Sequence, residues 1–233
     1  MCGRFGLSLN AADLAELLQL DLELLSGEPL EARYNIAPGQ RSPVVRLDRA
    51  GRRRLHLVRW GLVPSWARDE TIAHKLINAR SETVSEKPSF REAFRRRRCL
   101  VPADGFYEWK QDGGQKVPHH IGRRGGEPFC FAGLWERWTT PTGEPLDTFT
   151  ILTTGANDLL APLHARMPVL LPEQAWDRWL DRRRPGEELT SLLAPWPAED
   201  MEFWPVSTEI NRVENDHPGL RERHEPEPEL RLL

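Results

Sequence analysis

A cysteine at the second position is the residue whose placement points most directly to chemistry. Methionine aminopeptidases remove an initiator methionine that precedes a small residue, and Cys2 would then carry a free α-amine and a thiol on adjacent carbons. Such a 1,2-aminothiol condenses with an aldehyde to a Schiff base, and its sulfur then closes a five-membered thiazolidine ring. The α-amine titrates at about 7.7 to 8.0 and is partly neutral, hence nucleophilic, at cellular pH. Position alone also fits an unreactive cysteine in a frayed chain end.

Proton transfers accompany that chemistry, and three polar side chains elsewhere in the chain suit them. A carbinolamine must lose water and an imine must be protonated, which are tasks for a carboxylate and an imidazole. Glu108, between Tyr107 and Trp109, fits the carboxylate role, and a histidine such as His164 fits the imidazole role. Asn78 has donors and an acceptor that would hold the terminus or substrate hydroxyls. Each also has a structural alternative: a solvent-facing strand residue for Glu108, a packing residue for His164 and a helix cap for Asn78.

The charge of the chain is unevenly distributed. The formal net charge is −3, yet residues 1–100 contain 18 Lys and Arg against 12 Asp and Glu. Arginine, which binds phosphate in a bidentate manner, supplies nearly all of the positive charge. Arginine runs occur at 52–54 and 95–98, and each fits either a solvated face or a basic groove that binds a polyanion. The run at 95–98 is not assigned to a site.

Composition argues against several classes of protein. No apolar run reaches the length of about 18 residues that a membrane helix needs, so no membrane association is predicted. Acidic residues interrupt the segment 7–25, which therefore lacks a secretory signal pattern, and we expect a cytoplasmic protein. The three cysteines lack CxxC spacing, which argues against disulfides and zinc. No metal or organic cofactor is predicted, because ligand spacing and a glycine-rich phosphate loop are both missing from the sequence.

The elements that must position these side chains follow from hydrophobic periodicity. Leucines at helical spacing predict a helix over 10–25, and further helices are predicted over 172–180 and 186–193. Short apolar runs bounded by Pro and Gly predict strands over 42–47, 54–60, 99–109, 119–123, 128–138, 147–154, 167–171 and 203–207. We therefore expect an α+β fold: one domain over 1–220, with a curved, mainly antiparallel, barrel-like sheet flanked by helices. Residues 221–233, rich in Glu, Pro and Arg, are expected to form a mobile tail.

Six ordered segments resemble a single protein family. They are residues 1–5, 33–39, 60–66, 78–83, 102–109 and 164–169, and the collinear match runs from Cys2 to 205–207. Together they closely resemble the SRAP family, named for an SOS-response-associated peptidase, whose members shield abasic sites in single-stranded DNA. The resemblance implies the SRAP fold over almost the whole chain.

The resemblance implies catalytic roles for Cys2, Asn78, Glu108 and His164. After loss of Met1, Cys2 would attack the C1′ aldehyde of a ring-opened abasic deoxyribose and end as a thiazolidine crosslink. A retained Met1 would block the amine and prevent this reaction. The chain departs from the family between the histidine and the arginine of the last segment, where many members carry an acidic residue and this chain has alanine.

Other positions are implied to contact DNA. Proteins that bind single strands combine a positive groove with aromatic side chains on which bases stack. Arg4, Arg80 and Arg166 match phosphate-facing positions of the family, and Trp66 or Phe106 would wedge against the bases beside the lesion. The remaining positions that match DNA-contacting segments are Asn35, Pro38 and Thr153.

Three functional hypotheses follow. The leading one is a monomeric DNA-damage protein, associated with the nucleoid when bound to DNA, that captures abasic sites covalently, with reversal and abasic-site lyase activity as secondary expectations. The second is a cysteine peptidase with Cys2 as nucleophile and His164 as base, whose action is either general or confined to removal of Met1. The third is a non-catalytic binder of single-stranded nucleic acid, in which Cys2 is dispensable.

Overall fold

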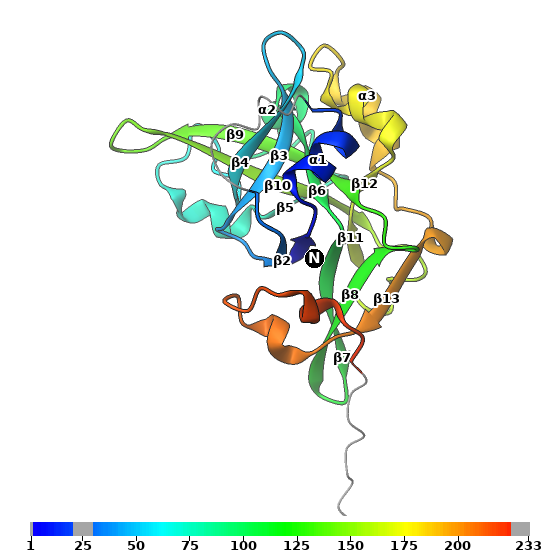
Figure 1. Cartoon of the computed structure of the whole chain (residues 1–233). Helices are drawn as coiled ribbons and strands as arrows, with labels where there is room; N and C mark the ends of the chain where they lie inside the picture. The colour runs from blue at the N-terminus through cyan, green and yellow to red at the C-terminus, as the bar shows by residue number, and fades with distance from the viewer. Residues whose placement is uncertain (1, 21–29, 225–233) are drawn as a thin grey trace, which may run out of the picture.

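Five strands close into a mixed β-barrel (Figure 1). The computed structural model describes residues 2–20 and 30–224. Around the ring the order is β10 (Pro145–Gly155), β4 (Arg53–Trp60), β3 (Arg41–Leu47), β6 (Arg98–Ala103) and β9 (Phe129–Thr139), which returns to β10. All neighbouring pairs are antiparallel except β10 and β4, which are parallel. The predicted α+β class with a barrel-like sheet is confirmed.

Short strands extend the barrel at its rim. Beyond its pairing with β4, β10 continues between β5 (Asn78–Arg80), which is parallel to it, and β11 (Arg166–Pro168), which is antiparallel. β12 (Leu170–Leu171) pairs with β9. The rim therefore lays β5 beside β10, which lies more than 60 residues later in the sequence, and β11 on the other side of β10.

A second, antiparallel sheet packs beside the barrel. Its strand order is β13 (Met201–Pro205), β8 (Gln115–Arg123), β7 (Gly105–Asp112), β1 (Phe5–Leu7) and β2 (Arg33–Ile36). β6 and β7, predicted as one strand over 99–109, are separate strands that pass from the barrel into this sheet at Asp104. The Asp104 carboxylate accepts bonds from the amide and hydroxyl of Ser8 at 2.7 and 2.5 Å and pairs with Arg221. Asp104 therefore fixes the corner between the two sheets.

Aromatic side chains fill the space between the barrel and β1. The ring of Phe5 packs edge-on against Trp60 and Phe131, with centroid distances of 5.1 and 5.9 Å. All three rings are fully buried, and each buried large apolar side chain contributes about 1.5 to 3 kcal/mol to folding. Because β1 begins three residues after Cys2, this packing fixes the position of the chain start.

The predicted N-terminal helix is correct at its start and wrong in its extent. α1 (Ala11–Leu18) begins after Asn10, whose side chain accepts bonds from two first-turn amides. It ends because Gln19 adopts a left-handed conformation, with φ 51°, and donates its N–H to the last turn. Residues 21–25 of the predicted helix lie outside the described residues.

The other helices are short. α3 (Trp176–Leu180) covers only the second half of the predicted helix 172–180, and the segment Gly186–Leu193 is a 3-10 helix. α2 (Arg91–Arg96), which periodicity did not predict, is six residues long. Segments this short gain little from α-helical propagation, so their packing decides the conformation. Further 3-10 turns lie at Glu70–Lys75, Glu173–Ala175, Ala198–Asp200, Thr208–Asn211 and Pro218–Arg221.

The structure joins the start of the predicted tail to the fold. Arg221, assigned to the tail over 221–233, pairs with Asp104, and its guanidinium lies 4.9 Å from the centroid of the Tyr34 ring. Residues 225–233 of that segment lie outside the described residues, and the domain limits stay a prediction.

None of the helices within residues 2–20 and 30–224 has the length and apolar character needed to cross a membrane.

Arg98 joins the ends of two helices. Its side chain is 3% exposed, and burial lowers its pKa to about 10, so the guanidinium is charged at neutral pH. It donates five bonds of 2.5 to 3.2 Å to backbone carbonyls at the end of α2, at the end of α3 and in the turn that follows α3. The last carbonyls of a helix have no partner within it, so the guanidinium supplies the missing donors. The acceptors are the carbonyls of Phe94, Arg95, Trp179, Asp181 and Arg184.

Replacement of Arg98 with alanine is expected to lower the free energy of unfolding by about 3 to 5 kcal/mol, because it leaves buried carbonyls without donors. Arg96→Ala, at a side chain that is 65% exposed, is the matched control and should change stability by less than about 0.5 kcal/mol. Urea unfolding of both variants measures the difference. Equal unfolding midpoints would show that Arg98 does not hold the two helix ends.

A buried histidine gives the second sheet a pH dependence. His120 on β8 packs against Tyr107 and Trp204, with ring centroids 5.3 and 4.8 Å away. A Cβ added to Gly105 would lie 2.1 Å from its Nε2, so the ring rests directly on the backbone of that glycine. Burial, assisted by Arg221, lowers the pKa of His120 to about 3. The ring is therefore neutral in the folded protein at pH values where an unfolded histidine is charged.

Acid is accordingly expected to destabilise the protein between about pH 6.5 and pH 3, since the unfolded state binds a proton there and the folded state does not. His120→Leu should weaken this dependence by an amount on the order of a few kcal/mol across the range. Urea unfolding at a series of pH values measures the slope. Ile121→Ala, on the same strand, is the control and should lower the free energy of unfolding at every pH without changing its dependence on pH. If His120→Leu keeps the full pH dependence, His120 is not its source.

Candidate active site

The start of the chain lies between the barrel and the second sheet, near the centre of the molecule (Figure 1). Cys2 is fully buried and belongs to the main hydrophobic core. Its Sγ lies 3.8 Å from the carbonyl oxygen of Arg4, to which it donates a weak hydrogen bond. The residue is therefore held in a defined position and is not part of a frayed end.

Asn78 binds the backbone of Cys2 directly. Its Nδ2 donates to the Cys2 carbonyl oxygen at 2.8 Å. Asn78 is the first residue of β5, opposite Ile151 of β10, so the alternative of a helix cap is wrong. Because β5 is paired with β10, the position of the Asn78 side-chain amide is fixed at the barrel rim, where it contacts the chain start.

Glu108 acts on the thiol of Cys2 through its charge. Burial raises the pKa of the Cys2 thiol well above its ordinary value, and the Glu108 carboxylate raises it further. The sheet explains this proximity: Phe5 pairs with Phe106, and the amide of Tyr107 donates to the Arg4 carbonyl at 3.0 Å. The chain start thus runs antiparallel to β7 and past Glu108. Glu108 is only 7% exposed, so the alternative of a solvent-facing strand residue is wrong.

His164 lies just before β11 and is oriented by its own backbone neighbourhood. The amide of Arg166 donates to Nδ1 of His164 at 2.9 Å. The same nitrogen lies 3.2 Å from the carbonyl oxygen of Arg166, so Nδ1 is occupied by the backbone of Arg166 on both sides. The side chain of His164 is half-buried, which leaves the ring within reach of the surface.

Arg166 is committed to internal partners on the rim. Its guanidinium forms a bidentate pair with Glu82, at 2.6 and 2.9 Å, and donates to the Thr153 carbonyl at 2.6 Å. The bonded guanidinium lowers the pKa of Glu82 below its ordinary value. Thr153 is fully buried, so it supports Arg166 from beneath and offers no exposed side chain. Sequence reasoning did not assign Glu82, although it lies within the segment 78–83.

Arg4 and Asn35 form an internal clamp on the C-terminal segment. Arg4 donates to Asn35 Oδ1 at 2.7 Å and to the Ile210 carbonyl at 2.8 Å. Asn35 is fully buried, and its Nδ2 donates to the carbonyls of Arg212 and Asn215 at 2.9 and 2.8 Å. Because the Asn35 side chain is fully buried, it stabilises the fold around the site and is not accessible to a ligand.

Three members of the predicted DNA-contacting set are exposed to solvent. They are Pro38, Arg80 and Trp66. Among residues 2–20 and 30–224, Trp66 is the one large hydrophobic side chain that is exposed, with an exposed fraction of 58%. Phe106 is different, because it is fully buried against Phe131 at 5.9 Å. Of the two aromatic residues considered as wedges, only Trp66 is accessible.

Asp216 is a further residue of this region that sequence reasoning missed. Its carboxylate accepts bonds from the amides of Tyr34 and Asn35, at 2.5 and 3.2 Å, and pairs with Arg33. It thereby ties the segment 33–39 to the C-terminal loop. A single aspartate in a polar loop carries no sequence signal for this role.

In the described part of the chain, no group of three or more His, Cys, Asp or Glu side chains is arranged to hold a metal ion.

The mixed barrel, with a buried Cys2 that Asn78 binds and Glu108 approaches, agrees with the fold and the site that the resemblance of the sequence implied. The model of the family described as SOS response associated peptidase (SRAP) matches residues 1–213. The chain belongs to the SRAP family.

Relatives extend over nearly the whole chain. It is 45% identical to the abasic site processing protein YoqW of Bacillus subtilis (strain 168), covering 96% of this chain and 100% of the relative. It is 34% identical to the abasic site processing protein YedK of Escherichia coli (strain K12), covering 92% and 96%. A crystal structure of a protein from Bacteroides thetaiotaomicron superposes with a TM-score of 0.86 at 29% identity, covering 96% and 100%.

Proposed function

We propose that this protein captures abasic sites in single-stranded DNA covalently, through the amine and thiol of Cys2 after removal of Met1. The observation that carries the proposal is the convergence of Asn78 and Glu108 on Cys2. Relatives that cover nearly the whole chain are named abasic site processing proteins, and this supports an abasic lesion as the substrate.

The chemistry begins at the aldehyde of the ring-opened deoxyribose. The Cys2 amine adds to C1′ to form a carbinolamine, which loses water to give an imine. The sulfur then adds to the same carbon, so that a C–S bond forms and the thiol proton is released as the imine nitrogen gains one. The products are a thiazolidine and one water molecule, with no oxidant or reductant required.

Each side chain of the site has a task in this sequence. The raised thiol pKa keeps the sulfur protonated until the imine forms, and Glu108 accepts the thiol proton when sulfur attacks. Nε2 of His164, the ring nitrogen that the Arg166 backbone does not contact, exchanges a proton with the leaving oxygen during ring opening or dehydration. Asn78 holds the carbonyl of Cys2, which fixes the amine and thiol relative to the incoming aldehyde.

DNA binding is assigned to exposed residues of the predicted DNA-contacting set. Arg80 supplies a charge for a backbone phosphate, and Trp66 supplies a face on which a base stacks, worth about 1 to 3 kcal/mol. Arg166 would contact a phosphate by exchanging part of its pair with Glu82. Because the imine stage is reversible, slow release and abasic-site lyase activity are expected at the same centre.

The test is incubation of the processed protein with single-stranded DNA that contains one abasic site, followed by a denaturing gel. A heat-stable adduct is expected with this DNA and not with an undamaged strand. A peptidase would instead cleave peptides in trans, but a raised thiol pKa is opposite to the lowered one that thiolate nucleophiles need. A non-catalytic binder would give salt-sensitive binding and no denaturant-resistant species. Either of those outcomes would overturn the proposal.

A further inference from the structure

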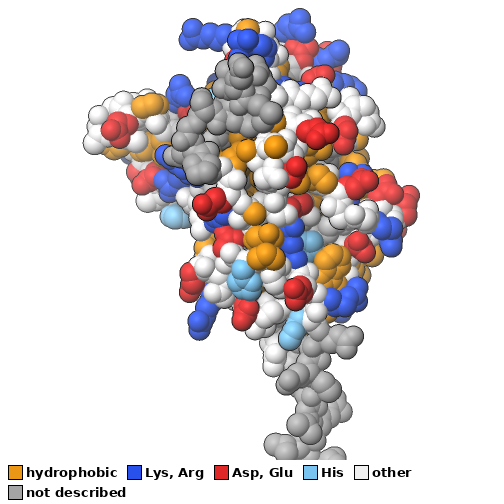
Figure 2. Space-filling view, in the orientation of Figure 1, with side chains coloured by type: hydrophobic (Ala, Val, Ile, Leu, Met, Phe, Trp, Pro, Cys, Tyr) orange, Lys and Arg blue, Asp and Glu red, His pale blue; other side chains and the backbone are white. Residues whose placement is uncertain are grey.

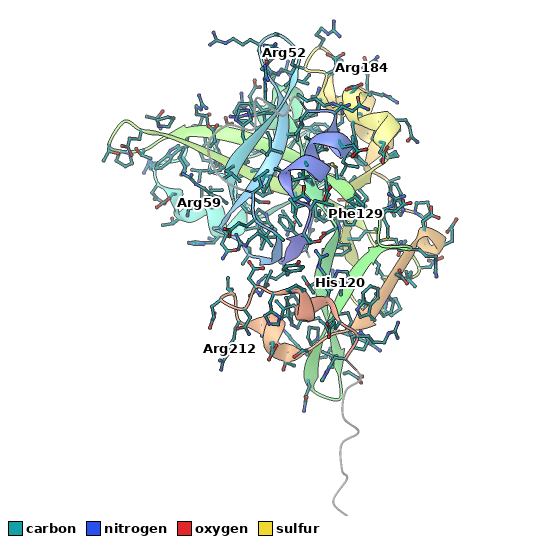
Figure 3. The ribbon with its side chains drawn as sticks, viewed as in Figure 1. Arg52, Arg59, His120, Phe129, Arg184 and Arg212 are labelled. Carbon is teal, nitrogen blue, oxygen red and sulfur yellow. The ribbon has the colours of Figure 1, made fainter. Side chains whose placement is uncertain are left out.

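Arginine side chains gather at the end of the barrel where α2 and α3 lie, apart from the chain start. Figure 2 shows blue side chains at this end, and Figure 3 places Arg52 and Arg184 there, whereas His120 and Arg212 lie toward the second sheet. Two open cavities meet at the segment 182–184, with volumes of about 980 and 720 Å³. The arginine face comprises the arginines that line them: Arg49, Arg91, Arg95, Arg96, Arg178, Arg182, Arg183 and Arg184.

This face has more positive charge than its neighbours neutralise. Five carboxylates line the same cavities: Asp48, Glu92, Asp177, Asp181 and Glu187. Two of these pair with arginines outside the face, since Asp48 binds Arg54 at 3.0 Å and Asp177 binds Arg53 at 2.6 Å.

The pairs within the face leave its arginines accessible. Glu92 lies 3.2 Å from Arg96, yet that arginine stays 65% exposed, and Arg183 is 90% exposed although it pairs with Asp181. Exposed pairs of this kind contribute about 0 to 1 kcal/mol, so a phosphate readily replaces them. Within residues 2–20 and 30–224, Arg91 and Arg182 lie within 4.0 Å of no carboxylate oxygen.

Arg98 organises the arginine face from below. Its five bonds fix the carbonyls of Arg95 and Arg184 to one guanidinium, so that the two arginine runs lie against each other. Arg98 itself is buried and charged, which adds to the positive potential beneath the surface. Members of the run at 95–98 therefore have different roles. Arg98 binds backbone carbonyls, whereas the side chains of Arg95 and Arg96 are exposed to solvent.

We propose that the arginine face is a second nucleic-acid contact, which binds phosphates of the sugar backbone away from the lesion. Arginine forks bind phosphate oxygens in pairs, and a broad, polar, open surface suits a backbone that presents charge repeatedly. The choice of nucleic acid among polyanions rests on the proposed function. Because the face lies apart from Cys2, it adds affinity for DNA without taking part in capture.

The test uses anisotropy of a labelled, undamaged single-stranded oligonucleotide across a series of salt concentrations. Arg96→Ala/Arg183→Ala removes two charges of the face that are 65% and 90% exposed. Lys116→Ala/Arg124→Ala, which removes one exposed charge on β8 and one directly after it, is the matched control. The first variant should bind roughly tenfold more weakly at low salt, with a salt slope smaller by about 1.4. The control should match the unmodified protein, and both variants should still form the adduct with saturating abasic DNA.

The two proposals fail separately in this design. If no adduct forms with any protein, while undamaged DNA still distinguishes the two double variants, the capture proposal fails and the second contact stands. Equal affinity and equal salt slope for the two variants would overturn the second contact. So would an arginine-face variant that loses affinity for polyglutamate by the same factor as for DNA, because the face would then recognise acidic chains in general.

Discussion

Cys2→Ala is expected to abolish the heat-stable adduct with abasic DNA completely while leaving the imine stage intact. Alanine is small, so Met1 is still removed and a free α-amine remains to condense with the aldehyde. Without sulfur, no ring closes, and the imine hydrolyses on denaturation. Treatment with borohydride should therefore trap a covalent product with Cys2→Ala by reducing the C=N bond, and mass spectrometry should show one added hydride in the linkage.

Cys2→Ser is the matched control for shape, because an oxygen replaces the buried sulfur. Its hydroxyl is a weaker nucleophile toward the imine, and the variant should resemble Cys2→Ala. Mass spectrometry of each free protein must first confirm that Met1 is removed. A heat-stable adduct from either variant in the absence of borohydride would exclude the thiazolidine.

Glu108→Gln is expected to slow adduct formation by about 100-fold or more, the usual contribution of a positioned general base. The substitution keeps the size of the side chain and removes the charge that acts on the Cys2 thiol. The amide cannot accept the thiol proton, so the imine should accumulate before the ring closes. Rapid-quench time courses, with and without borohydride, separate the imine from the final adduct.

Glu202→Gln, on β13 of the same sheet, is the control for loss of one carboxylate, and its rate should equal that of the unmodified protein. A stability measurement should show that Glu108→Gln remains folded. If Glu108→Gln forms the adduct at the normal rate, the carboxylate has no part in proton transfer.

Some of this architecture was predictable because it depends on local pattern. Strands such as β3, β4 and β10 are long enough for their apolar runs to stand out between Pro and Gly. β1, β2 and β5 have only three or four residues, too few for a periodicity to be recognised. These short strands hold Asn78 and the approach to Cys2, so the part of the fold that builds the site was the least visible.

The sequence by itself determined which residue types are present: a cysteine at position two, a glutamate, an asparagine and a histidine in motifs that resemble one family. Tertiary structure decided which of them meet. Pairing of β1 with β7 and of β5 with β10 brings Glu108 and Asn78 to Cys2 from two different sheets. It also buried Phe106 and Asn35, which a linear pattern cannot distinguish from surface residues. The physical reason is that contact and burial depend on sheet register and closure, which join segments far apart along the chain.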